Sequence, residues 1–239
     1  MGEKAVGLFR AIKPEWLNKT AELVIEGHDD ATIRAMLDEY LSYEIESAIN
    51  RAKTRQLLMN IWARTDTTPL IVHEKAKVAF SGTQSVKVAL SWALFILAHS
   101  VFADVSALIG KVTSVQNTFT TSWLKEKIRE AHGERPTLMR AVSGVLETMK
   151  HLGCIEQKSV GVYRVVKRNV KDEQTIIVML LSLLMLNKKA YYNVSELSSV
   201  PVFFPFEYEV TLGLLHQSPE FCLSNFGGKT VLTATLYSS

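Results

Sequence analysis

The fold of this chain is decided by FTTSWLKEKIREAHGERPTLMRAVSGVLETMKHLGCIEQKSVGVYRVVKR, which occupies residues 119–168. A charged, helical segment follows Trp123 and ends near Ala131, and a short break over 132–136 leads into a second helical segment over 137–152. After Gly153 the pattern changes to two short extended runs around a turn at 159–161. The stretch therefore predicts two helices that meet at a tight turn, followed by a β-hairpin.

The second helical segment has two distinct faces. Pro136 stands near its start and Gly153 just past its end, which is the usual asymmetry of helix termini. One face is apolar and predicts packing against a core; it carries Leu138, Val142, Val145, Leu146, Met149 and Leu152. The opposite face is polar and predicts exposure, with small residues in its middle; it carries Thr137, Arg140, Ser143, Gly144, Glu147, Lys150 and His151.

Positive charge is concentrated in this part of the chain. The formal net charge of the 239 residues is only +3, yet residues 121–171 hold eleven Lys and Arg against five acids. This window therefore carries +6 and the rest of the chain −3. Charge gathered in one segment indicates an acidic partner for that segment more clearly than the global balance does.

The basic residues suggest a way of meeting double-stranded DNA. A major groove admits an α-helix, arginine is well shaped to contact a guanine edge, and lysine and arginine meet the phosphates. We expect the second helix to lie near the groove through Arg135, Thr137, Arg140 and Ser143, with small Ser143 and Gly144 allowing close approach. The expected backbone contacts are Lys125, Lys127, Lys158 and Arg164, and a basic edge continues into Lys167 and Arg168.

In this succession of helix, turn, helix and hairpin, residues 101–168 resemble the winged-helix superfamily, whose members bind DNA or dock on proteins. The layout of the whole chain also resembles the BrxA-like accessory proteins of bacterial phage-exclusion systems. That second resemblance implies a mostly helical, cytoplasmic, DNA-binding protein with a role in antiviral defense. Transcription regulation and an adaptor role within a larger complex remain open alternatives.

The flanking regions complete a mainly α prediction with small β-hairpins. We expect a helical region over 1–100, the winged helix-turn-helix over 101–171 and a C-terminal region of mixed character over 172–239. Pro14 should open the first long helix and Asp30 should cap the second. Residues 206–217 fit a strand or a helix, and residues 221–237 predict a hairpin that turns at Gly227 and Gly228. A helix over 206–217 would make the C-terminus a second winged unit.

Several other classes of protein are disfavoured. The apolar runs between Lys87 and Asp104 and between Thr175 and Asn187 are shorter than the roughly 20 residues that a membrane-spanning helix needs. Two cysteines are too few for a disulfide scaffold, which indicates a reducing, cytoplasmic setting. The histidines and cysteines lack metal-ligand spacing, so we expect no metal, no cofactor and no enzymatic activity. Glu156 and Lys158 have a nuclease-like spacing, but a companion aspartate is missing.

Overall fold

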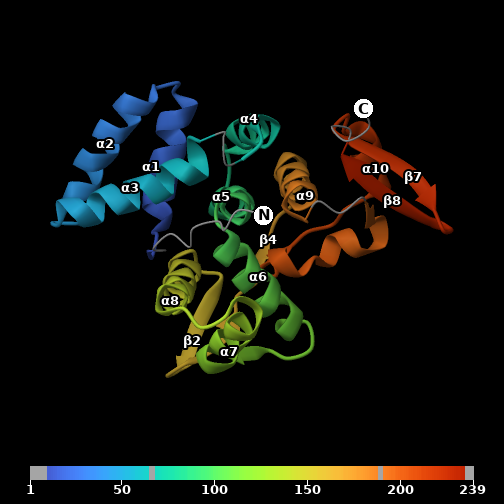
Figure 1. Ribbon diagram of the computed structural model, residues 1–239. Helices are drawn as coiled ribbons and strands as arrows, with labels where there is room; N and C mark the ends of the chain where they lie inside the picture. Colours follow the sequence, from blue (N-terminus) through green and yellow to red (C-terminus); the bar gives the residue numbers. More distant parts are fainter. Residues whose placement is uncertain (1–9, 65–67, 188–190, 235–239) are drawn as a thin grey trace.

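A computed structural model describes residues 10–64, 68–187 and 191–234 (Figure 1). Helices dominate and the strands are short, so the expectation of a mainly α protein with small β elements is confirmed. The expected lead around residues 6–12 lies largely outside the described residues, as does the end of the last hairpin strand beyond residue 234.

Three helices form the outer part of the N-terminal region, in blue and cyan in Figure 1: α1 (Pro14–Ile25), α2 (Asp30–Ser42) and α3 (Ala48–Trp62). Pro14 opens α1 as predicted. The cap of α2 differs by one residue, because the side chain of Asp29, and not of Asp30, accepts the N–H of Thr32 at 2.7 Å. Helix α2 ends at Ser42, and the side chain of Ser47 caps α3.

Helices α4 (Leu70–Ala79) and α5 (Gln84–Ala98) lead from this bundle to the centre of the molecule. Helix α5 is apolar almost all round and is buried along most of its length, as its sequence predicts. It packs against α9 (Glu173–Asn187) and α6 (Ser100–Thr113). One hydrophobic cluster therefore joins the N-terminal region to the two regions that follow it.

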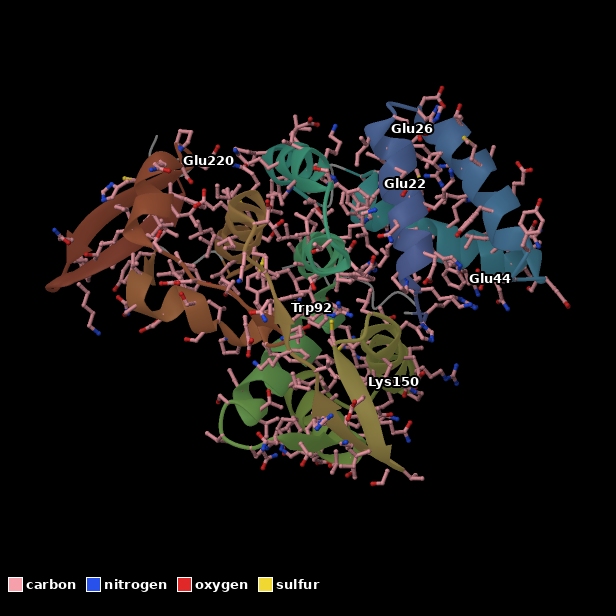
Figure 2. All side chains as sticks on the ribbon, turned by 180° about the vertical axis from the view of Figure 1, so that it is seen from behind. Glu22, Glu26, Glu44, Trp92, Lys150 and Glu220 are labelled. Atoms are coloured by element: carbon pink, nitrogen blue, oxygen red, sulfur yellow. The ribbon has the colours of Figure 1, made fainter. Side chains whose placement is uncertain are left out.

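Trp92 on α5 lies at the centre of the molecule (Figure 2). Its ring makes edge contacts with Phe102, Phe204 and Phe206, with ring centroids 4.7 to 5.5 Å apart. Its Nε1–H donates a 2.9 Å hydrogen bond to the carbonyl oxygen of Val202. A buried indole satisfied in this way fixes the C-terminal region against α5 and α6.

Within the described residues, no single helix is both long enough and apolar enough to cross a bilayer. Helices α5 and α6 reach that length and composition only when taken together, and they meet at an angle of 117°.

Residues 100–165 form a unit of three helices and a three-stranded sheet, in green and yellow at the bottom of Figure 1. Its elements are α6, β1 (Thr118–Thr120), α7 (Thr121–His132), α8 (Pro136–His151), β2 (Ile155–Ser159) and β3 (Val162–Val165). The strands are antiparallel in the order β1-β3-β2. Strand β1 is too short to stand out in the sequence. We call this assembly the first winged unit.

The C-terminal region contains a second assembly with the same strand order. Strand β4 (Arg168–Asn169) pairs in parallel with β6 (Phe206–Glu207) and links the two halves. After α9 come β5 (Tyr192–Asn193), the 3₁₀ helices η1 (Val194–Ser199) and η2 (Pro201–Phe203), α10 (Leu212–Gln217), β7 (Phe221–Phe226) and β8 (Lys229–Ala234). Its sheet order, β5-β8-β7, is that of β1-β3-β2, with the first strand beside the third and the third beside the second.

This second assembly answers the open question about residues 206–217. They are neither one strand nor one helix, because a two-residue strand precedes the six-residue α10. The hairpin turns at Gly227 and Gly228 as predicted, and both residues have positive φ values, 58° and 76°. We call α9 together with residues 191–234 the second winged unit.

Candidate nucleic-acid interface

The first half of α8 is open to solvent. Thr137 and Arg140 are exposed on it, and Arg135 is exposed just before its first turn. Arg140 forms no ion pair with any residue that the structure describes. The predicted groove-facing residues Arg135, Thr137 and Arg140 are therefore brought together at one end of one helix.

The second half of α8 is covered. The main-chain N–H of Ile12 donates a 2.9 Å hydrogen bond to Oγ1 of Thr148, and His151 Nδ1 lies 3.3 Å from the carbonyl oxygen of Ile12. Ile12 and Thr148 are fully buried. The predicted exposed face of α8 is thus interrupted by the segment that precedes α1.

This contact corrects one expectation. The sequence predicts that small Ser143 and Gly144 are exposed and allow close approach to a groove, but both residues are half-buried. The hydroxyl of Ser143 donates to the carbonyl oxygen of Met139 at 3.2 Å, within its own helix. The residue pattern of one helix shows which face is polar. It does not show whether a segment distant in the sequence packs against that face and forms hydrogen bonds with it.

Helix α7 carries Lys125 and Lys127, and both residues are half-buried. Lys127 Nζ lies 2.6 Å from Glu130, whereas Lys125 has no ion-pair partner among the described residues. The start of α7 lies beside the tip of the hairpin, because the N–H of Thr121 donates to the carbonyl oxygen of Gly161 at 2.9 Å. A helix N-terminus attracts phosphate, and sequence reasoning missed this feature. The signal was available in Thr120, which caps α7.

The two basic residues of the hairpin share one carboxylate. Lys158 Nζ lies 2.8 Å and Arg164 Nη2 lies 2.6 Å from Oε1 of Glu156. The hydrogen bond from Lys158, together with the nearby charge of Arg164, lowers the pKa of Glu156. Tyr163 faces inward and Arg164 outward, as predicted. Lys158 and Arg164 therefore sit together on the wing, but beside a carboxylate that competes for them.

Lys167 and Arg168 have other partners. Lys167 Nζ donates to the carbonyl oxygen of Phe204 at 2.8 Å, and Arg168 Nη2 donates to that of Leu152 at 2.8 Å. These bonds fasten the exit from β3 to the second winged unit and to the end of α8. Both head groups are thus hydrogen-bonded to main-chain carbonyls, although Lys167 is exposed and Arg168 is half-buried.

The acids of this segment are distributed among its bases. Each of the five acidic side chains in residues 121–171 pairs with a basic residue of the same segment. Three of those pairs are three residues apart on one helix: Glu126 with Arg129, Lys127 with Glu130, and Glu147 with Lys150. Exposed ion pairs of this kind contribute little free energy, so they do not prevent their basic members from also meeting a polyanion.

Comparison with known proteins gives little support for an identity. No protein-family model matches the chain, and no curated protein matches it. A solved structure described as an uncharacterized protein from Magnetospirillum magneticum is similar to 76% of this chain and 93% of its own, with 14% identity and a TM-score of 0.49. A likeness at this level carries no argument about fold or function.

Proposed function

We propose that the first winged unit binds duplex DNA and catalyses no reaction on it. The observation that carries this proposal is Arg140, exposed without an ion-pair partner among the described residues on the open half of α8. Arg135 and Thr137 lie at the same end of α8, and a major groove admits an α-helix.

The phosphate contacts would come from the surrounding elements. Lys125 and Lys127 stand on α7, Lys158 and Arg164 stand on the wing, and the N-terminus of α7 lies next to the wing tip. These groups belong to the helix that precedes α8 and to the hairpin that follows it. Such an arrangement supports a protein that is placed by backbone contacts while one helix meets the bases.

For the biological setting, we propose an accessory factor of bacterial phage defence or a transcription regulator in the cytoplasm. The support is the resemblance of the chain's layout to BrxA-like proteins and the use of only two cysteines. Membership of the winged-helix superfamily is proposed on the same terms, from the element order α6-β1-α7-α8-β2-β3.

A second candidate function is a protein-interaction adaptor. One observation favours it: the covered half of α8 and the paired wing leave a smaller open basic surface than the charge count predicts. The same surface could meet an acidic protein. The two candidate functions predict different results when binding to duplex DNA is measured directly.

That experiment is fluorescence anisotropy with a labelled duplex at low salt. We expect Arg135→Ala with Arg140→Ala to weaken binding at least about tenfold, because each good arginine contact contributes about 1–3 kcal/mol. Lys53→Ala with Lys229→Ala removes the same charge from exposed sites on α3 and β8, and should change the affinity by less than about twofold. Equal affinities for the two double variants would defeat the proposal. Absence of duplex binding, with co-purification of an acidic protein, would favour the adaptor.

A further inference from the structure

The second winged unit repeats the strand order of the first but not its charge. Residues 191–234 contain one basic residue, Lys229, and four acids, Glu196, Glu207, Glu209 and Glu220. The helix in the position of α8 is α10, which has only six residues. A short helix in an acidic unit is poorly suited to DNA, because phosphates repel it. We therefore expect the second winged unit to have a role other than DNA binding.

The outer strands of the two sheets differ in the way their edges are protected. Strand β2 carries Glu156 and Lys158, and its register shifts between Gln157 and Ser159. Strand β7, FCLSNF, has no charge and no proline, and it pairs with β8 without interruption from Phe221 to Phe226. Charges, prolines and bulges are the devices that keep sheet edges from pairing with other strands. Strand β7 has none of them.

The open edge of β7 is also accessible. It lies at the end of the sheet among the strands that the structure describes, and the hairpin projects from the body of the molecule (Figure 1). Cys222, Ser224 and Phe226 line one exposed face of the strand. Phe226 is 62% exposed, and its ring lies 5.2 Å from that of Tyr191. An exposed aromatic residue next to an unprotected edge indicates an interaction surface.

We propose that β7 pairs antiparallel with β7 of a second copy of this chain, which joins two second winged units through one continuous sheet. A second copy fits because this edge is uncharged along all six residues, so that two identical edges meet without repulsion. Residues that oppose each other in an antiparallel pair lie on the same face. A two-fold axis at Ser224 would therefore place Phe226 opposite Cys222 of the second copy and cover the exposed ring.

The rest of the molecule permits this arrangement. The first winged unit and the β7–β8 hairpin lie at different ends of the molecule in Figure 1, so the dimer would leave both basic surfaces open. Closed two-fold dimers with the same patch on both subunits are the commonest assemblies of soluble proteins. One pair of six-residue strands is small beside the about 1,600 Å² of a standard interface, so we expect a weak dimer that dissociates on dilution.

Sedimentation velocity on the full chain, without DNA, tests the proposal. The wild type should shift from monomer to dimer as its concentration rises from about 1 μM to several hundred μM. Ser224→Lys places a charge at the centre of the edge and should raise the dissociation constant at least about tenfold. Ser195→Lys adds the same charge to an exposed position on η1 and should behave as the wild type. A wild type that stays monomeric, or a dimer that Ser224→Lys leaves intact, would overturn the proposal.

A covalent test checks the register without depending on the stability of the Ser224 variant. Phe226→Cys puts a thiol opposite Cys222 of the second copy, at a separation that a disulfide can bridge. Within one strand the same two positions are four residues apart, roughly 13 Å, which is too far for a disulfide. Oxidised Phe226→Cys should therefore run as a dimer on a non-reducing gel, and Cys222→Ser added to it should abolish the band. Absence of that band at concentrations where the wild type dimerises would contradict the proposed pairing. Neither measurement involves nucleic acid, so both are independent of DNA binding.

Discussion

The main-chain N–H of Ile12 and the hydroxyl of Thr148 lie 136 residues apart in the sequence and form a buried 2.9 Å hydrogen bond. This bond joins the segment before α1 to the second half of α8. It limits the open part of α8 to the end that carries Thr137 and Arg140. The N-terminal region thus helps to define the candidate DNA surface without contributing a basic residue to it.

Thr148→Val should remove the acceptor and leave the buried N–H of Ile12 without a partner. We expect the free energy of unfolding to fall by about 1–3 kcal/mol in urea denaturation. Thr113→Val is the matched control, since the hydroxyl of Thr113 bonds only within its own helix, to the carbonyl oxygen of Ile109. The control should lose less than about 1 kcal/mol. Equal losses in the two variants would show that the bond to Ile12 contributes nothing.

Glu156→Gln should strengthen DNA binding. The carboxylate holds both Lys158 and Arg164 and repels phosphate, so its neutralisation frees two cations at the wing. We expect the dissociation constant for duplex DNA to fall about twofold to fivefold. Glu39→Gln neutralises an exposed acid on α2 and serves as the control for net charge. If Glu156→Gln bound DNA no better than Glu39→Gln, the wing would not be in contact with the backbone.

The stability of the protein should depend on pH through His99, at the junction of α5 and α6. Desolvation lowers the pKa of His99 to about 4, below its ordinary value near 6.5. The unfolded chain therefore takes up this proton first. The contribution of neutral His99 is complete above about pH 6.5 and is lost as the pH falls toward 4, by about 2–3 kcal/mol. His99→Gln should lose less stability over this window in urea titrations. An unchanged pH profile would refute this assignment.

The two cysteines should differ in reactivity. Burial raises the pKa of the Cys154 thiol to about 12, whereas Cys222 is exposed on β7. Because the thiolate is the reactive form, the native protein should react with one equivalent of an aromatic disulfide reagent and the unfolded protein with two. Cys222→Ser should leave the native protein unreactive. Rapid reaction of that variant would mean that Cys154 is accessible.

Much of the fold could be predicted from local pattern. The apolar face of α8, the all-round burial of α5 and the glycine turn of the last hairpin follow from the periodicity and from residues with special backbone preferences. Strand β1 could not be predicted, because three residues carry no periodic signal. The one-residue error at the cap of α2 arose because Asp29 and Asp30 are equally good capping residues.

The candidate site was harder to predict because charge and position are different properties. The sequence shows that Lys158, Lys167 and Arg168 belong to a basic segment. It does not show which groups they contact, because those contacts depend on the fold. Lys167 donates a hydrogen bond to the carbonyl oxygen of Phe204, which lies 37 residues away in the sequence. No local sequence pattern predicts such a contact. Pairs three residues apart on a helix, such as Glu126 with Arg129, could have been read from the sequence.

The most direct test of the central claim is the salt dependence of duplex DNA binding. If about five basic groups of the first winged unit meet phosphates, the affinity should fall roughly 500-fold between about 50 and 200 mM salt. Arg135→Ala with Arg140→Ala should bind more weakly but keep a similar slope, because these two arginines are proposed to meet bases and the slope follows the number of phosphate contacts. A wild-type protein that shows no salt-dependent binding to duplex DNA over this range would contradict the account.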